Sequence, residues 1–189
     1  MLIDLITWPE TSWIKIIRMK HLPNLTFILG GAASGKSAYA ELLCTQSGQA
    51  KIYIATAQLF DDEMGAKVAK HLDQRGTDWT TIEAPLHVAS ALKTASAVDV
   101  VLVDCATLWL TNVILGDHDL GVQTDELLTA LTSCMAPVII VSNEVGQGIV
   151  PDNALSRRFR NAQGQLNQDI AARADAVVAV MAGLPLVLK

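Results

Sequence analysis

A glycine-rich loop that ends in a lysine and a serine constrains this chain more than any other feature. Residues 30–37 read GGAASGKS and satisfy the pattern G-x-x-x-x-G-K-[ST]. The apolar run LTFIL enters the loop, and the helix-forming run SAYAELL leaves it. This strand–loop–helix context favours a phosphate-binding loop (P-loop) over a chance glycine-rich turn. The sequence therefore predicts a nucleotide-binding protein but does not indicate what it phosphorylates.

Each part of the loop has a chemical task. Glycines allow the backbone to wrap around a phosphate with its N–H groups pointing inward, and the following helix N-terminus adds a partial positive charge. We expect Lys36 to bridge the β- and γ-phosphates as a catalytic cation, and the Ser37 hydroxyl to ligate Mg²⁺. The nucleotide-binding residues predicted here are Gly30, Gly31, Ala32, Ala33, Ser34, Gly35, Lys36 and Ser37.

A P-loop also needs a carboxylate at the end of a neighbouring strand to hold the metal ion. The run VDVVLVDC places Asp104 directly after the four apolar residues 100–103. It should emerge at the carboxyl edge of the sheet, where open α/β folds bind their ligands. Asp99 precedes the run and is expected at the far end. The alternative for Asp104 is an N-cap for the segment that follows, and the P-loop makes the metal role the better interpretation.

Short aliphatic runs alternate with helix-like segments from residue 25 onward. LTFIL, KIYIAT, DVVLVD, PVIIVSN and AVVAVM each read as a strand buried on both faces. Helices are predicted over residues 36–46, 62–74, 86–95, 124–134 and 155–174. This rhythm predicts an α/β fold of the P-loop NTPase type, with a mostly parallel sheet flanked by helices. The last run, LVLK, is expected as an antiparallel edge strand.

The overall composition narrows the function further. At 189 residues and 51% apolar, the chain has room for one domain with a full core. A net charge of −5 gives no basic surface for nucleic acid or anionic lipid. No run approaches the roughly 20 apolar residues of a membrane span. Cys44, Cys105 and Cys134 lack metal-ligand spacing and indicate buried thiols in a reducing compartment, so a cytoplasmic location is expected.

Residues 1–23 stand apart as an apolar N-terminal extension, in which Pro9 interrupts any helix. The extension is either an element that packs on the core or on a partner, or an artefact of start-site choice, because Met19 would begin a compact domain. We favour the second interpretation. Residues 24–189 are expected to form a single P-loop nucleotide-binding catalytic domain.

Several stretches in a fixed order resemble one enzyme family. They are FILGGAASGKS, YIATAQLFDDEM, the spacing K-H-L-D-Q-R-G-x-x-W from Lys70 to Trp79, VDCATLWLTN, and SNEVGQGIVPDN continuing to RRFRNAQGQLNQ. Over residues 27–189 the chain resembles the bifunctional adenosylcobinamide kinase / adenosylcobinamide-phosphate guanylyltransferase family of cobalamin biosynthesis. The resemblance implies a RecA-like fold and two activities. The first phosphorylates the aminopropanol hydroxyl of adenosylcobinamide; the second transfers GMP from GTP onto that phosphate, through a guanylylated histidine, giving adenosylcobinamide-GDP.

The position that matches the guanylylated histidine is His71. A neutral imidazole is a good nucleophile near pH 7, so attack on the α-phosphorus of GTP with loss of pyrophosphate is reasonable. A lone helical histidine is more often a solvated surface residue, and only the surrounding motif favours catalysis here. His21, His87 and His118 lack comparable neighbours and are expected to be structural or exposed.

The matching motifs imply further site residues. Nucleotide contacts are implied for Ala55, Thr56, Ala57, Leu72, Asp73, Gln74, Arg75, Glu83 and Asp104. Alternative roles remain for Arg75 as a helix-end cation and for Glu83 as a strand cap. The resemblance also implies Mg²⁺, held by Ser37 and Asp104, with GTP and ATP as substrates, a corrinoid acceptor, and a homotrimer with its sites at subunit contacts.

Two polar stretches and two departures from the family pattern complete the site prediction. Asn143 and Glu144 follow a buried strand and are candidates for corrinoid or metal contacts. The arginines at 157, 158 and 160 either bind a substrate phosphate or form a solvated helix face. Ala33 stands where an arginine is common in the family, which removes one phosphate contact, and Asn161 stands where aspartate is frequent.

Two other functions remain open on sequence grounds. One is a monofunctional P-loop kinase that acts on a small alcohol, with His71 only structural. The other is a nucleotide-binding switch protein with little turnover, which does not need a nucleophile beside the loop.

Overall fold

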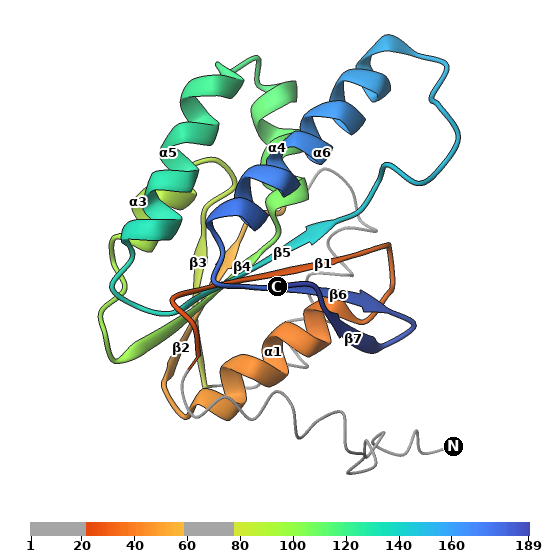
Figure 1. Cartoon of the computed structure of the whole chain (residues 1–189). Coiled ribbons are helices and arrows are strands. Elements are labelled where there is room, and N and C mark those ends of the chain that lie inside the picture. The colour runs from red at the N-terminus through yellow and green to blue at the C-terminus, as the bar shows by residue number, and fades with distance from the viewer. Residues whose placement is uncertain (1–21, 59–77) are drawn as a thin grey trace, which may run out of the picture.

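A sheet with helices on both faces forms the body of the molecule (Figure 1). The computed structural model describes residues 22–58 and 78–189 of the chain. The helix expected over residues 62–74, which contains His71 and most of the implied guanine-nucleotide contacts, lies outside the described residues. The same holds for residues 1–21 of the N-terminal extension.

Strands and helices alternate along the described residues. The strands are β1 (Leu25–Gly30), β2 (Ala50–Ala55), β3 (Trp79–Glu83), β4 (Asp99–Asp104), β5 (Val138–Asn143), β6 (Ala176–Met181) and β7 (Leu184–Val187). The helices are α1 (Lys36–Ser47), α3 (Val88–Leu92), α4 (Ala106–Leu115), α5 (Leu120–Ser133) and α6 (Ala154–Arg173).

The sheet is parallel except at one edge. Its strand order is β3-β2-β4-β5-β1-β6-β7, and only the β6–β7 pair is antiparallel. This confirms the expected mostly parallel α/β fold with an antiparallel edge strand. The P-loop strand β1 lies between β5 and β6, and β4, which carries Asp104, lies on the other side of β5.

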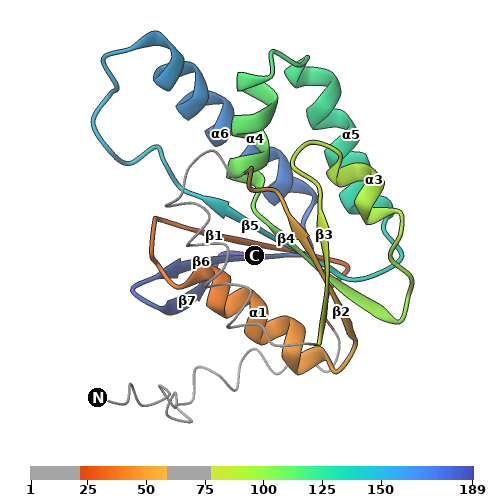
Figure 2. The same ribbon diagram turned by 180° about the vertical axis from the view of Figure 1, so that it is seen from behind.

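Apolar residues alternate between the two faces of the strands, so that both faces are buried. On one face Phe27, Val101 and Val103 pack under α3, α4, α5 and α6, with Trp109 of α4 at 1% exposure. On the other face Ile28 and Leu102 pack against α1 (Figure 2). Among the described helices, α1 covers that second face, whereas α3, α4, α5 and α6 cover the first.

Two elements escaped the sequence prediction for identifiable reasons. Strand β3 is an edge strand whose residues Thr80, Thr81 and Glu83 are exposed, so it has no apolar run. Helix α4 is buried on nearly all sides and therefore lacks the one-sided periodicity of a surface helix.

The predicted limits of three other elements were also wrong. The helix expected over 86–95 shrinks to Val88–Leu92, and the one expected from 124 begins at Leu120. There the Asp119 side chain accepts a hydrogen bond from Val122 N and caps the helix. The last strand spans Leu184–Val187 rather than LVLK.

Candidate active site

Six parallel strands, β1 to β6, end at one edge of the sheet, and the predicted site residues of the described ranges lie at or beside this edge. The strand that ends at Met181 is β6, and the other five end at Gly30, Ala55, Glu83, Asp104 and Asn143. In the strand register Gly30 is opposite Asn143, and Ala55 is opposite both Asp104 and Glu83. The P-loop leaves this edge after Gly30 and leads into α1. We call it the carboxyl edge.

The P-loop presents its backbone to solvent at the start of α1. Gly35 is the N-cap of the helix and has a φ of 93°, which glycine adopts without strain. Lys36, only 9% exposed, donates a hydrogen bond from Nζ to the Gly31 carbonyl at 3.0 Å. Burial lowers the pKa of Lys36, and the neighbouring Cys105 and Asp104 oppose that shift. The lysine is thus folded back over the loop, where an arriving phosphate would meet it.

A hairpin from the far end of the chain braces the P-loop. Gly183, in the β6–β7 turn, donates its N–H to the Ser34 carbonyl at 2.8 Å. Position 30 tolerates only glycine, because a Cβ there would lie 2.5 Å from both Ser34 Oγ and the Val180 carbonyl oxygen. The loop is therefore held between β1, α1 and the hairpin.

The two aspartates of β4 lie at opposite edges of the sheet, as the sequence predicted. Asp104, at the carboxyl edge, is half-buried and close enough to Lys36 to affect its pKa. The N-cap of α4 is Cys105, so the alternative N-cap role for Asp104 is wrong. Asp99, at the far edge, accepts hydrogen bonds from Ser96 N at 2.8 Å and Ser96 Oγ at 2.7 Å, and these bonds lower its pKa.

Thr56 lies beneath the carboxyl edge rather than at its surface. Its side chain is fully buried, and its hydroxyl donates to the Cys105 carbonyl at 2.8 Å and accepts from the Cys105 N–H at 2.7 Å. Asn112 of α4 adds bonds from Nδ2 to the carbonyls of Thr56 (2.8 Å) and Pro85 (2.9 Å). The hydroxyl of Thr56 is thus committed to joining β2 and α4, while Ala55 and Ala57 are half-buried beside it.

Sequence reasoning missed Asn112 as a residue that supports the site. The available signal was a lone amide within the apolar run ATLWLTNVIL, because a buried amide almost always has hydrogen-bond partners.

The remaining predicted residues differ in how the structure places them. Ser37 is half-buried in the first turn of α1, and Glu83 is exposed at the end of β3. The carboxylate of Glu144 accepts a hydrogen bond from Gly146 N and so turns back over its own loop. His87 and His118 are exposed, as expected. His21, His71 and residues 72–75 lie outside the described residues.

The cysteines are free thiols, as the sequence indicated. Burial raises the pKa of Cys44 to about 12 and that of Cys105 to about 11. Both therefore stay protonated near neutral pH, and neither is suited to nucleophilic chemistry.

The described part of the chain contains no cluster of three or more His, Cys, Asp or Glu side chains suited to a metal ion. Asp104 and Ser37 remain as one carboxylate and one hydroxyl beside the P-loop, a donor set that suits Mg²⁺ completed by phosphate oxygens and water. None of the helices in the described ranges is long and apolar enough to cross a lipid bilayer.

Comparison with known proteins decides the family. Residues 26–188 match the family described as cobinamide kinase / cobinamide phosphate guanyltransferase. The chain belongs to this family. The match confirms the resemblance stated from the sequence, and it favours a bifunctional enzyme over a monofunctional kinase or a switch protein.

Named relatives of this family extend over nearly the same length. The bifunctional adenosylcobalamin biosynthesis protein CobP of Pseudomonas aeruginosa is 48% identical over 165 residues, which cover 86% of this chain and 95% of the relative. The corresponding protein CobU of Escherichia coli is 36% identical over 181 residues, which cover 87% of this chain and 99% of the relative.

Solved structures of other proteins share the fold of this chain at low sequence identity. A prototypical ATPase from the type III secretion system of pathogenic bacteria has a TM-score of 0.52 at 10% identity and covers 88% of this chain and 57% of that one. The assembled ATPase EscN from the type III secretion system of enteropathogenic E. coli has a TM-score of 0.56 at 11% identity, covering 85% of this chain and 43% of that one. These likenesses support the P-loop, RecA-like fold.

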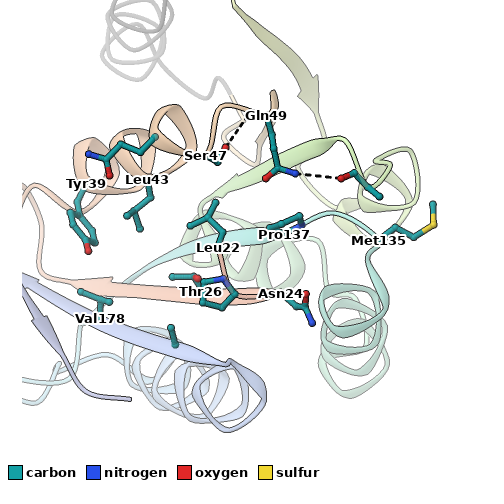
Figure 3. Close-up of a pocket in the computed structure, with 14 residues that line it drawn as sticks. Leu22, Asn24, Thr26, Tyr39, Leu43, Ser47, Gln49, Met135, Pro137 and Val178 are labelled. Atoms are coloured by element: carbon teal, nitrogen blue, oxygen red, sulfur yellow. Dashed lines mark hydrogen bonds between the residues drawn. The ribbon is translucent and has the colours of Figure 1, made fainter. Parts of the chain in front are cut away.

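A pocket of about 560 Å³ lies at the edge of the sheet opposite the P-loop (Figure 3). Its lining includes Asn24 and Thr26 at the start of β1, Pro137 before β5, and Tyr39 and Leu43 of α1. The hydroxyls of Thr26 and Tyr39 are buried and have no hydrogen-bond partner among the described residues. Burial raises the pKa of Tyr39 to about 12. We call this end of the sheet the amino edge.

Proposed function

We propose that this chain catalyses two successive transfers at the carboxyl edge. It first phosphorylates the aminopropanol hydroxyl of adenosylcobinamide and then joins GMP from GTP to that phosphate, giving adenosylcobinamide-GDP. The observation that carries the proposal is the placement of Lys36 and Asp104 around an open P-loop in a member of the cobinamide kinase / cobinamide phosphate guanyltransferase family.

In the phosphoryl transfer, the P-loop holds the nucleotide by its outer phosphates. Backbone N–H groups of residues 31–37 and the N-terminus of α1 face the phosphate oxygens, and Lys36 leaves the Gly31 carbonyl to bridge the β- and γ-phosphates. The hydroxyl oxygen of the corrinoid bonds to the γ-phosphorus while the bond to the β,γ-bridging oxygen breaks. The nucleoside diphosphate leaves, and the hydroxyl proton passes to water.

The residues present fit a magnesium ion. Asp104 would supply a carboxylate and Ser37 a hydroxyl, and phosphate oxygens would complete the ligand set. When bound, Mg²⁺ supplies neutralisation of the charge that develops on the departing phosphate. We propose Ser37 and Asp104 as its protein ligands.

In the guanylyl transfer, His71 acts as the nucleophile. Its neutral imidazole nitrogen bonds to the α-phosphorus of GTP, the bond to the α,β-bridging oxygen breaks, and pyrophosphate leaves. An oxygen of adenosylcobinamide phosphate then bonds to the same phosphorus, the phosphorus–nitrogen bond breaks, and the imidazole is regenerated. The support for His71 is the family motif around it.

Further assignments follow the same motifs. We propose nucleotide contacts at residues 30–37, Ala55, Thr56, Ala57, residues 72–75, Glu83 and Asp104, with both GTP and ATP as substrates. The half-buried positions of Ala55 and Ala57 support direct contact, whereas the buried hydroxyl of Thr56 supports a role in shaping the edge.

The assembly and location of the protein are also proposed. We propose one catalytic domain over residues 24–189, a homotrimer, and a cytoplasmic location. Large apolar side chains on and beside β7 are half or more exposed, namely Met181, Leu184, Leu186, Val187 and Leu188, and an exposed apolar edge strand is typical of a subunit contact. Light scattering on the purified protein measures the subunit number.

Labelling with [α-³²P]GTP tests the guanylyl transfer. Incubation with Mg²⁺ is expected to give a covalent GMP adduct that is labile in acid and stable in base. The His71→Asn variant is expected to lose the adduct but keep phosphorylation of adenosylcobinamide. His87→Asn is the matched control, because His87 is exposed and lies outside the proposed machinery.

The outcomes separate the candidate functions. Phosphorylated corrinoid without any adduct in the wild type would leave a monofunctional kinase. An adduct that persists in His71→Asn would move the nucleophile to another residue. Nucleotide binding without transfer to any corrinoid would overturn the proposal as a whole.

A further inference from the structure

A buried set of polar side chains lies directly behind the carboxyl edge. Thr107 of α4, Ser142 of β5, and Gln163 and Asn167 of α6 are each at most 7% exposed. Three elements that are distant in sequence thus place hydroxyls and amides in one otherwise apolar layer. We call these residues the polar cluster.

The members of the polar cluster are joined by short hydrogen bonds. Ser142 Oγ donates to Asn167 Oδ1 at 2.7 Å, and Gln163 Nε2 donates to Asn167 Oδ1 at 2.9 Å and to Ser142 Oγ at 3.0 Å. The hydroxyls of Thr107 and Ser142 are 3.4 Å apart. Burying amide groups is costly unless they are hydrogen-bonded, so these bonds favour one arrangement of the cluster, although Gln163 Oε1 has no partner among the described residues.

The cluster ends on the backbone of a single residue, Asn143. Asn143 N donates to Thr107 Oγ1 at 2.8 Å, and the Asn143 carbonyl accepts from Asn167 Nδ2 at 3.2 Å. The pairing of β5 with β4 stops at Val141 opposite Asp104, so Asn143 extends beyond its neighbour strand on that side. Two side chains therefore replace the ladder bonds that β4 no longer supplies.

The side chain of Asn143 points away from the cluster. Successive residues of a strand face opposite sides of the sheet, and Ser142 faces the cluster. Asn143 therefore faces the α1 side, as do Val141 of its own strand and Leu102 of β4. Asp104 follows Leu102 by two residues and shares this side. Asn143 is also opposite Gly30 of the P-loop strand in the register, and Glu144 N donates to the Gly30 carbonyl at 3.0 Å.

Asn143 is thus fixed by its backbone while its side chain remains available. Its amide is half-buried and makes no hydrogen bond within residues 22–58 and 78–189. An amide N–H held beside a P-loop is suited to donate to a phosphoryl oxygen, because a group already oriented needs no reorganisation when charge develops.

We propose that Asn143 contacts the terminal phosphoryl group of the bound nucleotide and that Thr107, Ser142, Gln163 and Asn167 are its positioning residues. This inference rests on the proposed function, because it assigns the residue a place on the triphosphate held by the P-loop. It also gives α6 a part in setting the geometry of transfer.

The Thr107→Val variant tests the positioning role in the full-length protein. Valine has nearly the shape of threonine but cannot accept the Asn143 N–H. Phosphorylation of adenosylcobinamide is expected to lose roughly tenfold in kcat, with less than about a threefold change in the nucleotide KM. Thr107→Ser keeps the hydroxyl and is expected to restore kcat to within about threefold of wild type. Thr26→Val, an equally buried threonine at the amino edge, is the matched control and is expected to leave kcat unchanged.

A double-mutant cycle separates positioning from general stability. Asn143→Ala is expected to lower kcat by roughly 10- to 100-fold, and Thr107→Val should add little in that background, because it acts through Asn143. The Asn143→Ala variant should also weaken binding of a non-hydrolysable GTP analogue while leaving GDP affinity near the wild-type value.

Specific outcomes overturn the inference. Multiplicative effects in the cycle, or a wild-type kcat in Thr107→Val, would show that the cluster serves only the fold. If Thr107→Val does not fold, Ser142→Ala removes the centre of the cluster with a smaller change in volume, and the same cycle applies to it. A wild-type protein without kinase activity would instead refute the proposed function, and is recognised before any variant is compared.

Discussion

At the amino edge of the sheet, Asp99 accepts two hydrogen bonds from Ser96; at the carboxyl edge, Asp104 follows the same apolar strand and lies near Lys36. The two residues have the same side chain and belong to the same strand. Asp99 is satisfied by donors three residues away, so it stabilises a turn. Asp104 is opposite Ala55 of β2 in the strand register and lies near Lys36 of the P-loop.

The two edges differ in shape as well as in chemistry. The pocket of about 560 Å³ lies at the amino edge and contains two hydroxyls without partners among the described residues. The carboxyl edge presents an open loop backbone and the polar cluster behind it. The pocket therefore lies at the edge opposite the proposed site, whereas the hydrogen-bonded polar cluster lies behind that site.

Removing the P-loop cation should have the largest effect and tests whether the carboxyl edge holds the nucleotide. Lys36→Ala is expected to reduce both transfers by at least about 100-fold, because the charge between the β- and γ-phosphates is lost. Steady-state assays of corrinoid phosphorylation and of GMP transfer measure this. Lys93→Ala, at an exposed position away from the edge, is the control, and equal losses in both variants would contradict the assignment.

Replacing each aspartate by asparagine in turn tests the difference between the two edges directly. Asp104→Asn is expected to reduce kcat by roughly 10- to 100-fold and to raise the Mg²⁺ concentration needed for half-maximal activity, because a charged ligand is lost. Asp99→Asn should leave both quantities near wild type. Magnesium titrations of the two variants under identical conditions measure this difference. An equal shift of the titration in Asp99→Asn and Asp104→Asn would contradict the role of Asp104 as a metal ligand.

The Asp99→Asn variant is expected to change the stability of the protein rather than its activity. Asp99→Asn is expected to lower the free energy of unfolding by about 1 kcal/mol at pH 7, because the charge-assisted bonds to Ser96 are weakened. The folded-state pKa of Asp99 lies below its ordinary value, so this contribution is present above the unfolded pKa. It is lost as the pH falls through the folded pKa. Urea unfolding of the wild type and the variant at pH 7 and at successively lower pH measures it, and a difference that does not shrink as the pH is lowered would contradict this origin.

The smallest effect is expected inside the pocket. Thr26→Val removes a buried hydroxyl that has no partner among the described residues, and should raise the free energy of unfolding by up to about 1 kcal/mol with unchanged kcat. Thermal unfolding of the variant and of Thr132→Val provides the measurement, since Thr132 Oγ1 does have a partner, the Leu128 carbonyl at 3.1 Å. A loss of stability in Thr26→Val would show that a water molecule or ligand uses the hydroxyl.

The sequence predicted those parts of the site that are local in the chain. The P-loop, the position of Asp104 at a strand end, and the opposite position of Asp99 each follow from one run of residues. The mostly parallel sheet followed from the alternation of such runs. The site roles themselves remain predictions until the experiments above are done.

The polar cluster escaped the sequence prediction because it is not local. Ser142 and Gln163 are 21 residues apart, and Thr107 and Ser142 are 35 apart. No spacing rule links them, since the packing of α6 across the sheet brings them together. A glutamine such as Gln163, one of several polar residues on a long helix, reads as solvent-facing until its burial is known.

The bond from Gly183 to Ser34 has a consequence for ligand affinity. A loop already fastened by the last hairpin has lost its conformational freedom during folding, so a nucleotide does not have to restrict it again on binding. Affinity for phosphate thus depends partly on residues that never approach the ligand. Lengthening the turn at 182–183 should loosen nucleotide binding without removing a single contact to it.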